Sequence, residues 1–175
     1  KEEKKVVVFD FGGGTFDVSV LDISNEVVEV LSTNGNTHLG GDDIDASVID
    51  WITSEFKKES GVDIKSDPMA FQRIKEEAEK AKIELSSVSE TDINLPFLTA
   101  TSSGPVHLNL KLSRSKFDQL IDNVVSSLFD SVNIALKDSG LKVDEVNEFL
   151  LVGGSTRIPL VRKKVSEYFG KDPNV

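Results

Sequence analysis

The segment VVVFDFGGGTFDVSV, residues 6–20, restricts the possible folds of this chain more than any other stretch. Its first residues are almost continuously apolar, which is typical of a buried strand. Beyond the glycines, Phe16, Val18 and Val20 alternate with polar residues, which predicts a second strand with one buried face. Because the link between the two strands is short, we expect them to pair in antiparallel orientation.

Strand and helix patterns alternate along the rest of the chain. Ile44, Val48, Ile52 and Phe56 recur every four residues, for example, which predicts an amphipathic helix. The further predicted strands are 27–31, 91–99, 106–112 and 148–154, and the predicted helices are 42–59, 68–85, 114–140 and 155–170, with a loop at 33–43.

This order of elements predicts an α/β fold made of two parts. Three strands open the chain, and a helix–strand–helix series closes it. The outer segments, 1–39 and 116–175, are expected to form one layered unit with a mixed sheet flanked by helices. Residues 40–115, with two helices and a hairpin, are expected to form an inserted α+β subdomain.

Composition excludes several classes of function. The chain has no cysteine, so disulfides and thiolate chemistry are excluded, which fits a reducing compartment. Lys and Arg number 20 and Asp and Glu number 30, giving a net charge of −10 that disfavours binding to nucleic acid. No long apolar run is present, so we expect no membrane span.

The glycine turn of the first hairpin suggests a phosphate site. Gly12, Gly13 and Gly14 have no Cβ, so an anion can approach their backbone N–H groups closely. Asp10 and Asp17 would repel phosphate unless a cation such as Mg²⁺ lay between the carboxylates and the phosphate. Thr15 offers a hydroxyl group at the same turn. A flexible hairpin with solvated carboxylates remains an equally good interpretation of this pattern by itself.

A second pair of glycines follows the last predicted strand. Gly153 and Gly154 are followed by a predicted helix that opens at Ser155-Thr156. The order strand, glycine pair, helix N-terminus is typical of an anion or nucleotide site. The alternative, a tight connection with a hydroxyl N-cap, explains the pattern as well.

Three polar residues share one face of the helix predicted from residue 68. Glu79, Lys82 and Ser86 are spaced i, i+3, i+7, away from the apolar stripe. Glu79 and Lys82 could bind two adjacent hydroxyls, as in a ribose, and Ser86 could reach a base nitrogen. Taken alone, the pattern is more typical of an exposed charged face.

The motifs FDFGGGTFDVSVL, TNGNTHLGGDDID, EKAKIELSS, TDINLPF and LLVGGSTRIP together resemble the nucleotide-binding domain of the seventy-kilodalton heat-shock chaperones, nearest to the DnaK type. The resemblance runs over the whole chain. It implies an actin-like, ribonuclease-H-like fold, of which this chain would be the second ATPase lobe. Residues 1–39 and 116–175 would be its inner subdomain and 40–115 its outer subdomain.

The resemblance also implies site residues. Phosphate binding is assigned to Gly12, Gly13, Gly14 and Thr15, and a loop beside the nucleotide to Gly40, Gly41 and Asp42. Ribose binding is assigned to Glu79 and Lys82, and adenine contacts to Ile83, Ser86 and Arg157. The rest of the adenosine loop is assigned to Gly153, Gly154, Ser155 and Ile158. Asp10 and Asp17 would lie near Mg²⁺ and K⁺, and Asp10 and Thr15 are candidate contributors to catalysis. Asp42 stands where many members have Glu, and Ile83 where some have Arg, so one cation–π contact would be absent.

The implied function is that of a stress-response chaperone that couples ATP binding and hydrolysis to the binding and release of unfolded peptides. The resemblance places other catalytic groups upstream, so we expect ATPase activity in the intact protein and, for this chain alone, weak nucleotide binding without turnover. A GrpE-type nucleotide-exchange factor would dock on the inserted subdomain, at loop 86–92 and the hairpin tip 101–105. A J-domain co-chaperone and client peptides would bind only the intact protein, in the bacterial cytoplasm or an organellar matrix or stroma. The alternative functions are a lobe of a sugar or acetate kinase and an actin-like filament protein.

Overall fold

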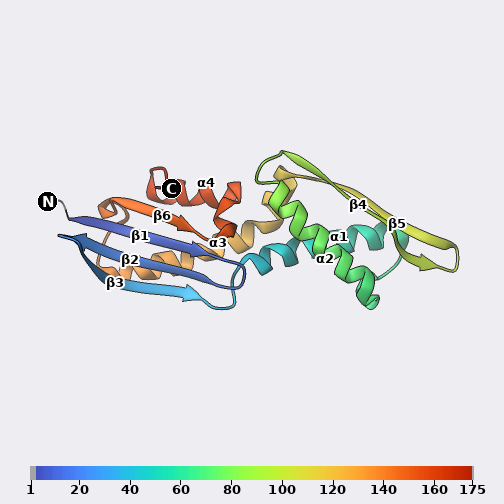
Figure 1. Ribbon diagram of the computed structural model, residues 1–175, viewed down its shortest axis with the longest axis horizontal. Helices are drawn as coiled ribbons and strands as arrows, with labels where there is room; N and C mark the ends of the chain where they lie inside the picture. Colours follow the sequence, from blue (N-terminus) through green and yellow to red (C-terminus); the bar gives the residue numbers. More distant parts are fainter. Residues whose placement is uncertain (1–2, 175) are drawn as a thin grey trace. The chain divides into compact units, whose positions relative to one another are not determined.

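The computed structural model describes residues 3–174, which fold into two compact units (Figure 1). The first unit contains the residues up to Asp42 and those from Asn123 onward, and the second unit is Asp43–Asp122. The chain passes from one to the other inside α1 (Gly41–Ser60) and inside α3 (Arg114–Ser139). The sequence placed these boundaries a few residues earlier, at 39/40 and 115/116.

The first unit is built on a mixed four-stranded sheet in the order β3-β2-β1-β6 (Figure 1). Its strands are β1 (Lys4–Phe11), β2 (Phe16–Ser24), β3 (Val27–Asn36) and β6 (Glu148–Val152). β1 pairs antiparallel with β2 and parallel with β6, and β2 pairs antiparallel with β3. The predicted mixed α/β architecture is therefore confirmed.

The end predicted for β3 is wrong. Pairing with β2 continues past Leu31 to Asn36, which lies opposite Phe16, although residues 33–36 were predicted to be loop. Asn and Gly have low strand propensity, but the ladder to β2 holds these residues extended. The loop before α1 is correspondingly short, since α1 already begins at Gly41.

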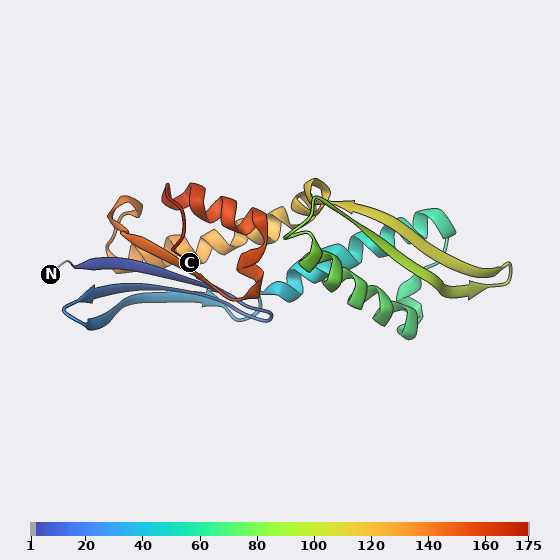
Figure 2. The ribbon, with the colours of Figure 1, turned by 45° about the horizontal axis from the view of Figure 1, so that its top comes forward.

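One face of this sheet forms the core of the first unit. Val7, Phe9 and Phe11 of β1 and the alternating apolar residues of β2 are completely or almost completely buried. Figures 1 and 2 show α3 and α4 (Pro159–Phe169) along the sheet. Phe9 lies 6.4 Å from the ring of Phe129 on α3, and Phe149 stacks on Phe169 of α4 at 4.8 Å. On α3, Ile121 and Val125 are buried, whereas Leu120 and Val124 are partly exposed.

The second unit combines helices with a long hairpin (Figure 2). It contains most of α1, a short 3₁₀ turn Ile64–Ser66, α2 (Pro68–Glu84), β4 (Glu90–Thr101), β5 (Gly104–Ser113) and the first part of α3. Asp67 caps α2 by accepting a hydrogen bond from the N–H of Ala70 at 3.2 Å. The apolar face predicted for α1 is buried, and on α2 Ala70 is buried whereas Phe71 is partly exposed. No helix among the described residues combines the length and the apolar content that crossing a bilayer requires.

Candidate functional site

In the first unit, the glycine turn after β1 is joined directly to the start of α1. The turn is closed by a hydrogen bond from the N–H of Gly12 to the carbonyl of Thr15 at 3.1 Å. The N–H of Gly41 donates to Gly12 O, and the N–H of Asp42 donates to Gly13 O, both at 2.8 Å. The first N–H groups of a helix lack acceptors within the helix. Here the glycine turn supplies two carbonyl acceptors for the first two N–H groups of α1.

Three loops are brought so close together that side chains are excluded from their contacts. A Cβ at Gly40 would lie 2.7 Å from Gly13 O and 2.8 Å from Thr15 N, and a Cβ at Gly41 would lie 2.6 Å from Ser155 Oγ. At Gly153, φ is +97° and a Cβ would lie 2.4 Å from Phe11 O. Since real Cβ atoms do not approach backbone atoms this closely, glycine is required at Gly40 and Gly153, whereas at Gly41 a Cβ would displace the Ser155 hydroxyl. The loops that contain residues 12–15, 40–42 and 153–156 therefore form one site.

The outer side of the glycine turn is open. A Cβ at Gly12, Gly13 or Gly14 would meet no atom within 4 Å. Within the described part of the chain, the N–H groups of Gly13 and Gly14 donate no hydrogen bond. Backbone N–H groups that are exposed, close together and without acceptors are suited to binding an anion such as phosphate.

Two carboxylates lie beside this turn. Asp10 and Asp17 are directly opposite one another in the β1–β2 ladder, so their side chains share one face of the sheet. Like charges in this position are destabilising unless a cation lies between them. Residues 3–174 hold no cluster of three or more potential metal ligands. A pair of carboxylates nevertheless fits Mg²⁺, which usually takes one or two carboxylates and completes its shell with waters and phosphate oxygens.

The loop after β6 differs from the prediction. A 3₁₀ turn, Gly154–Arg157, follows the strand, and α4 begins only at Pro159. Proline has no N–H and forces the preceding Ile158 into an extended conformation, with ψ 123°, so a helix cannot run through it from Ser155. The predicted helix N-terminus at Ser155-Thr156 is therefore wrong, and the argument from its dipole is lost.

The residues of this 3₁₀ turn differ in exposure. Ser155 and Thr156 are buried, and Thr156 Oγ1 donates to Gly153 O at 2.6 Å. Ile158 is also buried, so its side chain belongs to the core. Gly154 and Arg157 are exposed. Of the predicted adenosine loop, Gly154 and Arg157 are exposed to a ligand and Gly153 is partly exposed.

The other predicted site residues belong to the second unit. Glu79 and Ile83 are exposed on α2, Ser86 follows the helix, and Lys82 is mostly buried. The ammonium of Lys82 lies 2.8 Å from Oδ1 of Asp45 on α1. Sequence reasoning missed Asp45 because it is separated from Lys82 by a whole helix and a loop.

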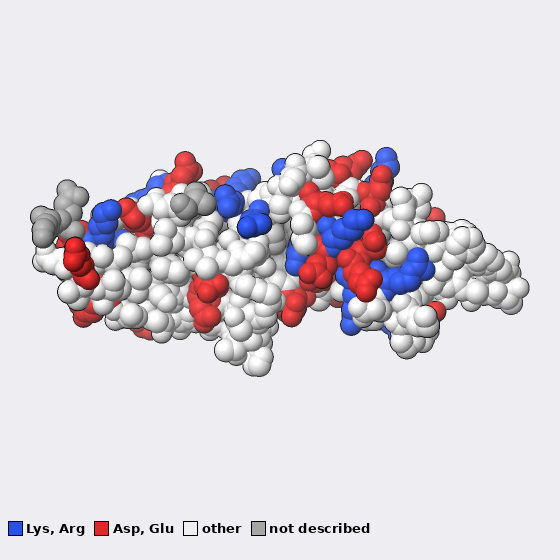
Figure 3. Space-filling model, in the orientation of Figure 1, with Lys and Arg blue, Asp and Glu red and all other residues white. Residues whose placement is uncertain are grey.

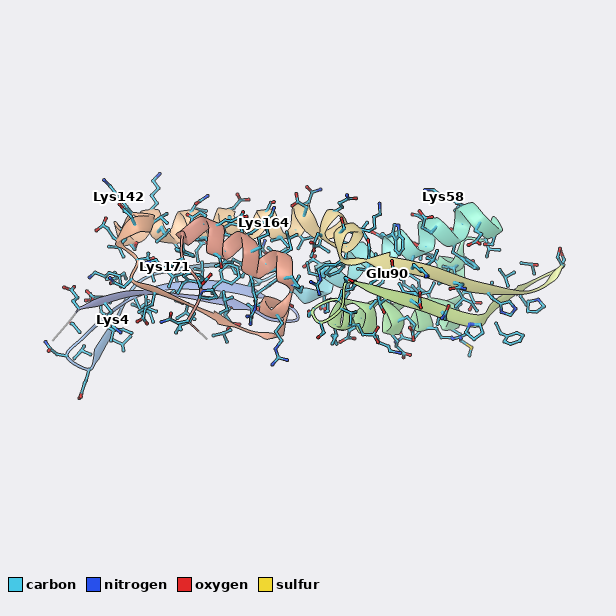
Figure 4. All side chains as sticks on the ribbon, turned by 90° about the horizontal axis from the view of Figure 1, so that it is seen from above. Lys4, Lys58, Glu90, Lys142, Lys164 and Lys171 are labelled. Atoms are coloured by element: carbon cyan, nitrogen blue, oxygen red, sulfur yellow. The ribbon has the colours of Figure 1, made fainter. Side chains whose placement is uncertain are left out.

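The loop that follows α2 is held in place by Arg114. The guanidinium of Arg114 donates to Leu85 O at 2.9 Å and to Val88 O at 2.8 Å. The backbone N–H of Arg114 donates to Ser89 O at 2.8 Å. A cavity of about 620 Å³ lies beside this loop, with walls that include Ile83, Val88 and three carboxylates, Glu84, Glu90 and Asp92. Figure 4 shows Glu90 at the start of β4.

A bulge in β4 presents an aromatic side chain to solvent. The ladder to β5 is interrupted between Leu95 and Thr99, and Phe97 has a φ of +54° and is 70% exposed. The N–H of Phe97 donates to Nδ1 of His107 at 2.6 Å, and Arg73 donates to the carbonyls of Phe97 and its neighbour at 3.1 and 3.0 Å. The bulge is therefore fixed by two other elements, α2 and β5.

Comparison with models of protein families provides independent information on this chain. Residues 1–175 match the family model that is described as "Hsp70 protein". The match covers both units, including all three glycine loops.

Proposed function

The chain belongs to the Hsp70 family, and from this we propose that it is the second lobe of the ATP-binding domain of a DnaK-type chaperone. Membership of the family supports a nucleotide-binding chaperone ATPase domain, and the mixed sheet flanked by helices is consistent with an actin-like ATPase lobe. The observation that carries the proposal is the convergence of three glycine loops beside two opposed carboxylates in the first unit. In the intact protein, ATP binding and hydrolysis would be coupled to the binding and release of client peptides, with a J-domain co-chaperone.

The proposed roles follow from the exposed groups. The N–H groups of Gly13 and Gly14 and the hydroxyl of Thr15 would bind phosphate oxygens, and Asp10 and Asp17 would hold Mg²⁺ directly or through its waters. Mg²⁺, when bound, would neutralise part of the phosphate charge, and K⁺ is proposed for the same acidic pair. In the second unit, Glu79 and Lys82 would bind the ribose and Ser86 and Ile83 the adenine.

Replacement of Asp10 by asparagine tests the phosphate and metal roles. We expect Asp10→Asn to weaken ADP binding about 10- to 100-fold in Mg²⁺, because a group that holds the metal or its waters loses its charge. In excess EDTA the same substitution should change ADP affinity little. Calorimetry at millimolar nucleotide measures both, and phosphate release by the chain alone should stay at the buffer level.

The matched control is Asp144→Asn, which removes the same charge from an exposed position of the first unit, away from the glycine loops. It should leave ADP affinity unchanged. The nucleotide proposal would be refuted if the parent chain bound no ADP, and the metal role would be refuted if Asp10→Asn acted equally with and without Mg²⁺.

We also propose that a GrpE-type exchange factor docks on the second unit. The proposed surface comprises loop 86–92, the hairpin tip 101–105 and the neighbouring bulge at Phe97. Figure 3 shows that the far end of the hairpin carries no charged side chains on the face in view. A rigidly held, exposed aromatic residue is the type of side chain that forms a binding hot spot.

Phe97→Ala should therefore weaken binding to a bacterial exchange factor at least about tenfold, measured by calorimetry or surface plasmon resonance. Val28→Ala is the matched control, because Val28 is an apolar residue of the first unit that is 57% exposed. An unchanged affinity for Phe97→Ala would exclude Phe97 from the docking surface, and the absence of any complex with the folded parent chain would refute the docking proposal.

A further inference from the structure

The ion pair between Asp45 and Lys82 differs from the surface ion pairs of this protein. The side chains of Lys82 and Asp45 are 15% and 18% exposed, whereas those of Lys65 and Asp50, on the same unit, are 56% and 72% exposed. Water screens the exposed pair strongly, but it screens the shielded pair much less. The position of the Lys82 ammonium is consequently determined by Asp45.

The backbone at both ends of this pair is held by the core of the second unit. Asp45 follows Ile44, which is completely buried, on the first turns of α1. Lys82 follows Ala81, which is 3% exposed, near the end of α2. Since both helices are packed at these points, the carboxylate is a fixed anchor for an otherwise flexible four-carbon stem.

A lysine ammonium has three donors, and its ion pair with Asp45 constrains the ammonium from one side. The remaining donors are held in a defined direction, so the entropy of ordering this side chain has already been lost before a ligand binds. We propose that Asp45 is a positioning residue that holds the Lys82 ammonium for the ribose hydroxyls of an adenine nucleotide. This inference rests on the proposed nucleotide-binding function and assigns no contact between Asp45 and the ligand.

Asp45→Asn tests the inference by comparing ADP with 2′,3′-dideoxy-ADP, which lacks the hydroxyls. The parent chain should bind ADP more tightly than the dideoxy nucleotide. Asp45→Asn should weaken ADP binding about 3- to 10-fold, the range expected when one long side chain must be ordered on binding, and leave dideoxy-ADP binding unchanged. Lys82→Met should remove the same preference, and the double variant should lose no more than Lys82→Met alone, because Asp45 acts through Lys82.

Asp50→Asn is the matched control on the same helix, since it breaks the exposed pair with Lys65 and should alter neither affinity. Asp45→Glu keeps the charge but moves it by one methylene, so an intermediate preference for ADP is expected. This variant carries the test if Asp45→Asn does not fold.

A merely structural role for Asp45 would weaken both nucleotides by the same factor and would overturn the inference. An unchanged preference for ADP in Asp45→Asn, or in Asp45→Glu where that variant carries the test, would also overturn it. If the parent chain binds neither nucleotide, the proposed function fails and the inference falls with it. That result is distinguishable, because it appears in the parent before any substitution is made.

Discussion

Phe9→Ala is expected to lower the free energy of unfolding of the first unit by about 3–5 kcal/mol, the range for truncating a buried phenylalanine. Phe9 is completely buried on β1, and its ring lies 4.7 Å from that of Phe16 and 6.4 Å from that of Phe129. The substitution removes the side chain that connects both strands of the first hairpin to α3. Because domains are stable by only about 5–15 kcal/mol, much of the stability of this unit would be lost.

Phe97→Ala is the matched control, since it makes the same chemical change at a side chain that is 70% exposed. It should alter the free energy of unfolding by less than about 1 kcal/mol. Urea denaturation followed by circular dichroism measures both variants. A loss of stability for Phe9→Ala as small as that expected for Phe97→Ala would show that the core of the first unit does not depend on Phe9. Phe97 also has a proposed docking role, so the two substitutions should separate stability from partner binding.

Periodicity in the sequence was sufficient to predict most of the secondary structure. The alternation of Phe16, Val18 and Val20 predicted a strand with one buried face, and all three side chains are buried. The four-residue repeat from Ile44 to Phe56 likewise predicted the buried face of α1 correctly. These patterns succeed because each element buries one side against the core of its own unit. Buried residues therefore recur with the period of the helix or strand.

The errors occur where a neighbouring segment overrides the local pattern. Asn36 was predicted to be loop, but its pairing with Phe16 keeps it in β3. Ser155 was predicted to open a helix, although Pro159 could have located the true start, because it limits the residue before it. The bulge at Phe97 depends on His107 and Arg73, which lie on other elements. No local signal in the sequence indicates these contacts.

In the candidate site, too, some features could be predicted from the sequence and others could not. The glycines were recognisable because no other residue type tolerates such close backbone approach, and the structure shows what they approach. The use of the α1 N-terminus was not predictable. Its first two N–H groups are bonded to Gly12 O and Gly13 O, so the anion donors of the proposed site are those of the turn itself. The position of the turn is therefore coupled to that of α1.

Gly153→Ala is expected to lower the free energy of unfolding of the first unit by about 2–4 kcal/mol, from backbone strain together with overpacking. At φ +97° any residue with a Cβ is strained, and the added methyl group would lie 2.4 Å from Phe11 O and 3.1 Å from Gly12 N. These atoms are backbone atoms at the end of β1 and cannot rotate away. Relief requires the strand end to move, and the glycine turn must move with it. ADP affinity should therefore fall together with stability.

Gly154→Ala provides a neighbouring control with the same chemical change. A Cβ at Gly154 would meet no atom within 4 Å, and Gly154 does not have the positive φ of Gly153. Its unfolding free energy should stay within about 0.5 kcal/mol of the parent value in urea denaturation. The difference between adjacent alanines isolates the contact with Phe11 and Gly12, since composition and helix propensity change equally in both. If the two variants were equally stable, the close packing of the loop after β6 on the glycine turn would be wrong, and with it the joining of the three loops into one site.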